Sequence, residues 1–297
     1  MIKIKKIGLL IFMAVVFLLV YEPNYNAAHI MQKSDLQVIA HRGFGNYGPD
    51  NSLSAVKMAI EANVDGVDLD GQMTSDGKLV IYHDPNLDRL SDGKGPLKEK
   101  TLAELKALDV GFKFDEKFRG ERIATYEEAL RIVDGKVKLI VELKTSTVGS
   151  DSSENIAVGL IQKYNAYDWT ILSSFNPFVL YRIKKLDKKV KTMFIFKDVN
   201  VDPEILREIH PTDSKGIPWV LRNDFCRSLM RRLINPDFLS AEITVNKNTV
   251  KKLIDKGYPL FLWPPNDEKT IKESIGVKPY GVITDEPILA KEIIVNL

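Results

Sequence analysis

Two of the four histidines in the chain stand where a short apolar run ends. His41 follows LQVIA and precedes Arg42, and His83 follows LVIY and precedes Asp84. Imidazole titrates near neutral pH, so it can give or take a proton during a reaction. A single histidine at a strand end more often only bonds a nearby carbonyl group. Two in the same context favour a paired acid and base.

Three carboxylates also stand near the ends of apolar runs. Asp68 and Asp70 alternate in VDLD, and Glu142 and Lys144 alternate in KLIVELKT, so each pair projects from one face of its strand. Converging carboxylates cannot all be ionised without a compensating positive charge. One hard divalent cation, Mg²⁺ or Ca²⁺, would supply that charge. The plainer alternatives are exposed aspartates on an edge strand and a surface Glu–Lys pair.

These residue types together suit acid–base chemistry on a negatively charged substrate. Cleavage of a phosphodiester needs a base for the attacking oxygen, an acid for the leaving alkoxide, and cations on the phosphoryl oxygens. Arg42 and Lys144 add fixed positive charge to the proposed metal, so the set of residues matches this requirement.

Such a site needs a scaffold that gathers strand ends. Beyond residue 34, strand-like runs alternate with helical patterns such as NSLSAVKMAIEA. The runs lie at 36–41, 66–70, 138–143, 170–175, 190–196, 239–244, 259–263 and 281–284. Eight strands separated by helices predict an α/β fold of the TIM (β/α)₈ barrel type, whose active sites lie at the carboxyl ends of the strands.

The apolar run at 79–83 is not one of these eight strands. Only SDGK separates it from the DLDGQMT segment, too short for a crossover to a parallel strand. It must therefore return as a β-hairpin excursion after the second strand. This geometry brings His83 back toward the barrel mouth. Because neighbouring strand residues face opposite sides, Asp84 need not be its partner.

Residues 1–28 differ from the rest of the chain. Three lysines precede the uncharged run IGLLIFMAVVFLLVY at 7–21, which is long for a signal peptide and short for a membrane span of about 20 residues. Both a cleaved signal peptide and an N-terminal membrane anchor fit, and the anchor is slightly favoured. The basic flank stays inside, so we expect residues 29–297 to form one extracytoplasmic domain, secreted or membrane-anchored.

Charge and cysteine content exclude some classes of protein. Residues 1–28 carry a net charge of +2, from three lysines and Glu22, which equals that of the whole chain. The remainder is therefore near neutral, which argues against a nucleic-acid partner. Cys226 is the one cysteine, so no intrachain disulfide can form.

The motifs of the chain point to a family. In order, they are HRG, PDN, DLD, TSDGKLVIYHD, ELK, SSF and GVITDEP, with Trp263 shortly before the last. Over residues 38–287 this series resembles the glycerophosphodiester phosphodiesterase family. The combination of HRG, the hairpin and HD at this spacing is highly specific, whereas ELK or SSF alone would mean little.

The resemblance implies a TIM barrel that hydrolyses small or polymeric glycerophosphodiesters to glycerol 3-phosphate and an alcohol. It implies roles for ten residues: an acid/base pair of His41 and His83; phosphate contacts from Arg42 and Lys144; metal ligands Asp68, Asp70 and Glu142; and a substrate pocket lined by Ser174, Phe175 and Trp263. Attack comes either from water or from the glycerol 2-hydroxyl through a cyclic phosphate, and the hydroxyl route is modestly favoured.

The chain departs from the family pattern at three places. Asp50 and Asp68 stand where the family usually has glutamate, which shortens the reach of each carboxylate by roughly 1.5 Å. The sequence WPPND replaces the usual Thr-x-Asn continuation, so Trp263 could also be a plain core aromatic. Two alternatives stay open: a phospholipase-type barrel acting on lipid headgroups or lysophospholipids, and a non-catalytic glycerophosphodiester-binding barrel.

Overall fold

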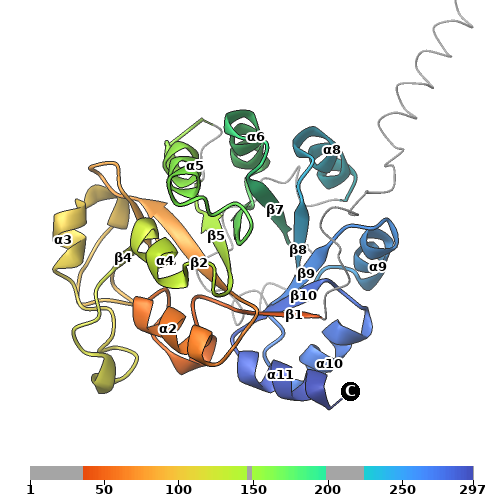
Figure 1. Ribbon diagram of the computed structural model, residues 1–297, viewed down its shortest axis with the longest axis horizontal. Coiled ribbons are helices and arrows are strands. Elements are labelled where there is room, and N and C mark those ends of the chain that lie inside the picture. The colour runs from red at the N-terminus through yellow and green to blue at the C-terminus, as the bar shows by residue number, and fades with distance from the viewer. Residues whose placement is uncertain (1–35, 146–148, 199–223, 297) are drawn as a thin grey trace, which may run out of the picture.

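The computed structural model describes residues 36–145, 149–198 and 224–296. Within these ranges eight parallel strands close into a barrel, because β1 pairs with both β10 and β2 (Figure 1). The strands are β1 (Gln37–Ala40), β2 (Gly66–Met73), β5 (Lys138–Leu143), β6 (Thr170–Ser174), β7 (Lys191–Phe196), β8 (Phe238–Glu242), β9 (Leu260–Trp263) and β10 (Gly281–Thr284). All eight were predicted from the sequence, and the TIM barrel is confirmed.

Helices surround the barrel as a ring in Figure 1. They are α2 (Leu53–Glu61), α4 (Tyr126–Val133), α5 (Ser153–Tyr164), α6 (Pro177–Leu186), α8 (Asp224–Ile234), α9 (Lys247–Asp255), α10 (Glu268–Gly276) and α11 (Pro287–Val295). Capping residues in the sequence determine where several of these helices begin. The Ser52 side chain caps α2 by accepting from the Ala55 amide, and Asn176 caps α6 with proline at the first helical position.

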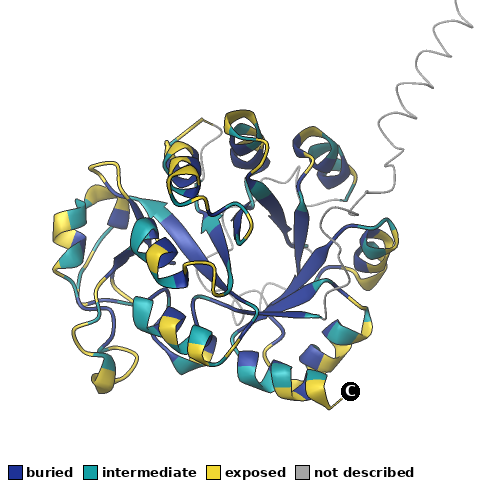
Figure 2. Cartoon of the chain, viewed as in Figure 1, coloured by how far each residue is buried: buried dark blue, intermediate teal, exposed yellow. Residues whose placement is uncertain are grey.

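The apolar core has two layers, inside and outside the strands. One cluster fills the space between strands and helices, and a second fills the barrel interior with side chains such as Ile39, Ile140, Met193 and Phe261. Figure 2 shows the strands buried and the outer faces of the helices exposed. The barrel is therefore packed with side chains, and its polar residues gather at the mouth.

The excursion after β2 is a hairpin, as predicted. β3 (Leu79–Ile81) runs antiparallel to β2, with Gly71 opposite Ile81, and Gly77 takes φ +72° in the turn. β3 then pairs with β4 (Ala124–Thr125). Residues 84–123 between them form the short helices η2 (Leu97–Glu99), α3 (Leu102–Lys106) and η3 (Glu116–Phe118) over a small core of their own.

The predicted N-terminal segment, residues 1–28, lies outside the described residues. Its division from the domain at 29–297 therefore stays a prediction. Within the described part of the chain, no helix is both long enough and apolar enough to cross a membrane.

Candidate active site

A pocket opens at the carboxyl ends of the strands, and its two halves differ in character. The charged half contains all seven residues predicted to act on the phosphate, the proton or the metal: His41, Arg42, Asp68, Asp70, His83, Glu142 and Lys144. The other half is mostly apolar, with Phe175, Met193, Ile195, Trp263 and Ile283. The barrel thus brings together side chains from β1, the β2–β3 hairpin and β5, as their positions at the strand ends predicted.

The turn after β1 has an unusual backbone that places His41 and Arg42. Arg42 takes φ +51°, and Gly43 and Gly45 follow with φ +100° and +53°. A Cβ on Gly45 would lie 2.2 Å from the carbonyl oxygen of Asp285, so only glycine fits there. The amide of Asn46 donates to that same carbonyl at 3.0 Å. This close packing fixes the turn against the end of β10.

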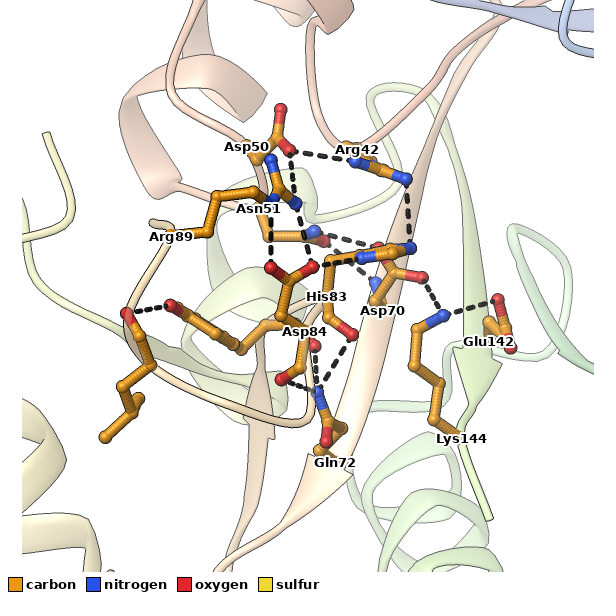
Figure 3. Close-up of polar contacts among 12 residues, drawn as sticks. Arg42, Asp50, Asn51, Asp70, Gln72, His83, Asp84, Arg89, Glu142 and Lys144 are labelled. Atoms are coloured by element: carbon orange, nitrogen blue, oxygen red, sulfur yellow. Dashed lines mark hydrogen bonds and ion pairs between the residues drawn. The ribbon is translucent and has the colours of Figure 1, made fainter. Parts of the chain in front are cut away.

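His83 is held between a carboxylate and a guanidinium. Its Nδ1 lies 2.6 Å from Asp84 Oδ1, and its Nε2 lies 2.9 Å from Arg42 Nη2 (Figure 3). A guanidinium only donates, so Nε2 accepts and Nδ1 carries the hydrogen that Asp84 accepts. Burial, with Lys144 and Arg42 nearby, lowers the pKa of His83 although Asp70 and Asp84 oppose the shift. The ring is therefore neutral at pH 7.

His41 has the opposite electrostatic surroundings. Its Nδ1 lies 2.7 Å from Asp285 Oδ1, and Asn266 donates to the other oxygen of Asp285 at 2.6 Å. Burial lowers the pKa of His41, but the Asp285 carboxylate outweighs it, so the pKa is raised. The same pair holds the pKa of Asp285 at about 2, although burial of the carboxyl acts in the other direction. His41 is therefore the imidazole better suited to carry a proton.

Asp70 and Glu142 share the Lys144 ammonium. Lys144 Nζ lies 3.1 Å from Asp70 Oδ1 and 3.2 Å from Glu142 Oε2 (Figure 3). Asn51 donates to Asp70 Oδ2 at 2.8 Å. Burial raises the pKa of Asp70, but Lys144, His83 and Arg42 outweigh it and hold that pKa far below its usual range. Asp70 is thus an anion in this pocket.

Asp68 behaves differently from Asp70. Its pKa rises to about 8, chiefly through burial. Repulsion from Asp70 and Glu142 adds to the rise, and the charge of His41 opposes it. A carboxylate in this position gains if further positive charge arrives. A cation beside Asp68 would relieve this repulsion.

The donors fit a hard divalent cation in kind. Asp68, Asp70 and Glu142 are oxygen ligands, and Asp70 is the direct neighbour of Glu142 in the β2–β5 register. Yet within the described ranges no three His, Cys, Asp or Glu side chains form a cluster that could hold a metal. The Lys144 ammonium bridges two of the three carboxylates and would have to move aside. Metal binding stays a prediction.

The predicted substrate-pocket residues divide into two groups. Phe175 and Trp263 line the pocket and meet edge to face, with ring centroids 5.8 Å apart. Trp263 also packs in the interior cluster, so it is both a wall and a core residue. Ser174 does not line the described pocket, because its hydroxyl donates to the Leu143 carbonyl at 2.9 Å. Asp50 lies beside the site and accepts from Arg42 Nη1 at 3.0 Å.

Sequence reasoning missed the residues that hold the two imidazoles. Asp285 stands in the TDEP motif, which had been noted without a role, and Asn266 is the asparagine of the WPPND segment. The pattern Trp-Thr-x-Asn thus keeps its asparagine here and loses only its threonine. Asp84 does bond the ring of His83, and Arg89 in turn donates to Asp84 at 2.7 Å from Nε. Alternation of strand faces had given no reason to expect this pair.

The fold and the site together define a TIM barrel whose mouth holds two buried imidazoles beside Arg42 and Lys144. Comparison with known proteins then gives the family. The model of the glycerophosphoryl diester phosphodiesterase family matches residues 41–289. The glycerophosphodiester phosphodiesterase of Caldanaerobacter subterraneus subsp. tengcongensis is 34% identical over 88% of this chain and 96% of its own length. This chain therefore belongs to the glycerophosphodiester phosphodiesterase family of enzymes.

More distant proteins are also similar to this chain. Glycerophosphodiester phosphodiesterase 1 of Mus musculus is 27% identical over 85% of this chain and 79% of its own length. The structure of an Oleispira antarctica phosphodiesterase, solved in complex with the product sn-glycerol-3-phosphate, matches with a TM-score of 0.69 and 23% identity. That match covers 91% of this chain and 99% of the Oleispira chain. At this identity the structural likeness speaks for the fold.

Proposed function

We propose that the chain hydrolyses glycerophosphodiesters to glycerol 3-phosphate and an alcohol, using one divalent cation and a pair of histidines. The observation that carries the proposal is the pairing of each imidazole with its own carboxylate beside one pocket, His41 with Asp285 and His83 with Asp84. The two pKa shifts run in opposite directions, which is what one acid and one base require. The product named in the Oleispira structure supports the same chemistry.

The neutral His83 serves as the base in this mechanism. Its Nε2 takes the proton of the attacking hydroxyl group, while its Nδ1–H keeps donating a hydrogen bond to Asp84. Arg42 donates to that Nε2, and a phosphate drawn to the guanidinium would free the lone pair for this role. The base therefore becomes available when substrate arrives.

His41, protonated and held by Asp285, serves as the acid. As the new P–O bond forms, the bond to the leaving alkoxide breaks, and the alkoxide oxygen receives the His41 proton. Arg42 and Lys144 neutralise charge on the phosphoryl oxygens throughout. In this step one proton enters His83 and one leaves His41. Where the 2-hydroxyl attacks, water then opens the cyclic phosphate to glycerol 3-phosphate, giving its proton to His41 while His83 returns a proton to the 2-oxygen, so both histidines are restored.

Asp68, Asp70 and Glu142 are the residues that would hold the cation, Mg²⁺ or Ca²⁺. When bound, such an ion polarises phosphoryl oxygens and lowers the pKa of an oxygen ligand. The aspartate at position 68, shorter than the usual glutamate, favours the more tolerant Ca²⁺ over Mg²⁺. Turnover of glycerophosphocholine by metal-depleted full chain, with each ion restored in turn, tests the proposal.

Metal binding should also raise the stability of the protein against thermal unfolding. We expect millimolar Ca²⁺ or Mg²⁺ to raise the unfolding temperature by several degrees, since ligand at a hundred times its Kd contributes about 2.7 kcal/mol. Glu142→Gln should abolish the shift, whereas Glu61→Gln, an exposed glutamate on α2, should keep it. If neither ion changes the unfolding temperature of the wild-type protein, the pocket holds no metal site.

The nucleophile is either water or the 2-hydroxyl of the substrate glycerol. We favour the hydroxyl, because it explains why the substrate must carry a free glycerol arm. A 2-deoxyglycerophosphodiester should then be turned over at least about a hundredfold more slowly than its parent. Steady-state kinetics on the two compounds decides the matter, and near-normal turnover of the deoxy compound would leave water as the nucleophile.

A further inference from the structure

Lys197 lies at the carboxyl end of β7, at the barrel mouth. Along this strand Met193 and Ile195 line the pocket, and Phe196 between them and Lys197 faces outward, with the Arg227 guanidinium 5.0 Å from its ring centroid. Lys197 directly follows the last residue of β7, and only 4% of the residue is exposed. Its ammonium sits 6.0 Å from the centroid of the Phe175 ring.

This lysine differs from Lys144 and Lys184, two other lysines with low exposure. Lys144 is paired with Asp70 and Glu142, and Lys184 with Asp237. For Lys197, no described residue offers the ammonium a hydrogen bond or an ion pair, and the ammonium lies over the Phe175 ring. A buried ammonium without an opposite charge is costly. A ligand that brings an anion there would relieve the cost.

Glu242 is the acidic residue that the β7–β8 register places beside Lys197. It follows Ala241, which pairs with Phe196 in the β7–β8 register, so it stands beside Lys197 at the mouth. Its Oε2 accepts from the Thr244 hydroxyl at 2.5 Å, and no ion pair with Lys197 occurs in the described part of the chain. The ammonium is therefore left for another group.

The two halves of the pocket show which part of a substrate reaches Lys197. The phosphate belongs in the charged half, so one organic arm of the diester must extend along the Phe175–Trp263 wall toward β6 and β7. Lys197 stands at the end of that wall, over the Phe175 ring. The glycerol arm is neutral, so an anionic group on an arm can only belong to the alcohol.

We propose that Lys197 is a specificity residue that selects glycerophosphodiesters whose alcohol carries a second anionic group, such as a phosphate. The inference rests on the proposed function and narrows its substrate class. An ammonium–phosphate contact is charge-assisted and worth more than a neutral hydrogen bond. We therefore expect the preference to appear mainly in KM, because Lys197 lies away from the reacting phosphate.

The test uses two substrates that differ only in the second anion: glycerophosphoglycerol, and the same compound phosphorylated on the alcohol. Full-chain wild type should show at least about tenfold higher kcat/KM for the phosphorylated compound. Lys197→Met should remove that preference and leave glycerophosphoglycerol within twofold of wild type, whereas Lys197→Arg should retain it. Lys191→Met removes the same charge from the far end of β7 and should change neither value.

The outcomes separate the two proposals. Turnover of both substrates at equal efficiency by the wild type overturns the role of Lys197 alone, and this measurement needs no variant to fold. An equal loss on both substrates in Lys197→Met and in Lys197→Gln would make the lysine structural, which also overturns the inference. Failure of the wild type to hydrolyse either compound would overturn the proposed function, and the inference with it.

Discussion

His41→Ala and His83→Ala should each lower kcat by roughly 10²- to 10⁴-fold, the range expected for general acid or base catalysis. Both rings face the same pocket and each is buried, so neither is readily replaced by bulk water. If the two act as a unit, as proposed, the double variant should lose little more than either single one. Steady-state kinetics on glycerophosphocholine measures all three.

The loss must come from chemistry and not from unfolding. Circular dichroism and the unfolding temperature show whether each variant is folded. As a control for activity, Lys57→Ala, which changes an exposed residue of α2, should match wild type in rate. If either single alanine variant retains more than about a tenth of wild-type kcat, that histidine is not the acid or base. Losses that multiply in the double variant would mean that the two act independently.

Asp285→Asn should shift the pH dependence of catalysis in a direction that the structure fixes. Asp285 raises the pKa of His41, which must be protonated to act as the acid. Without the anion that pKa falls, so the alkaline limb of kcat/KM should move to lower pH, by roughly one unit or more. The acidic limb, which reports protonation of His83, should stay in place because Asp285 does not contact that ring.

At neutral pH the same variant should lose about 10- to 100-fold in rate, since a hydrogen bond to a charged group contributes about 1.5–3 kcal/mol. Asp255→Asn, an exposed carboxylate at the end of α9, controls for the change in net charge. A rate loss without movement of the alkaline limb would show that Asp285 acts only through packing. No change in either quantity would remove Asp285 from the mechanism.

The barrel could be predicted because its signals are local. Each strand reads as a short apolar run, each crossover helix has an apolar stripe, and the four residues of SDGK allow only a hairpin. The convergence of Asp68, Asp70, Glu142 and Lys144 follows from strand alternation once the barrel is assumed. These inferences need no knowledge of which distant segments meet.

The residues that hold the histidines could not be reached in this way. Asp285 lies 244 positions from His41 in the chain and meets it only because β10 closes the barrel on β1. Asp84 bonds the ring of His83 because β3 has ended at Ile81, so alternation no longer governs the two residues. Ser174, the last residue of β6, donates its hydroxyl to the Leu143 carbonyl of the neighbouring β5 and not into the pocket.

The small core of residues 84–123 was missed for a related reason. Its apolar members, including Leu87, Leu97, Leu105 and Ile123, are spaced without a helical or strand period. They pack because short turns and one-turn helices bring them together over β3, and β4 is only two residues long. No periodic signal exists in such a segment for sequence reasoning to find.

The central claim is tested most directly by ³¹P NMR of glycerophosphocholine incubated with the full chain, before and after removal of metal. We predict that with Ca²⁺ or Mg²⁺ the diester resonance is replaced by that of glycerol 3-phosphate, and that chelation stops the reaction until the ion is restored. Release of phosphocholine in place of glycerol 3-phosphate, or undiminished turnover by the metal-depleted protein, would contradict the account.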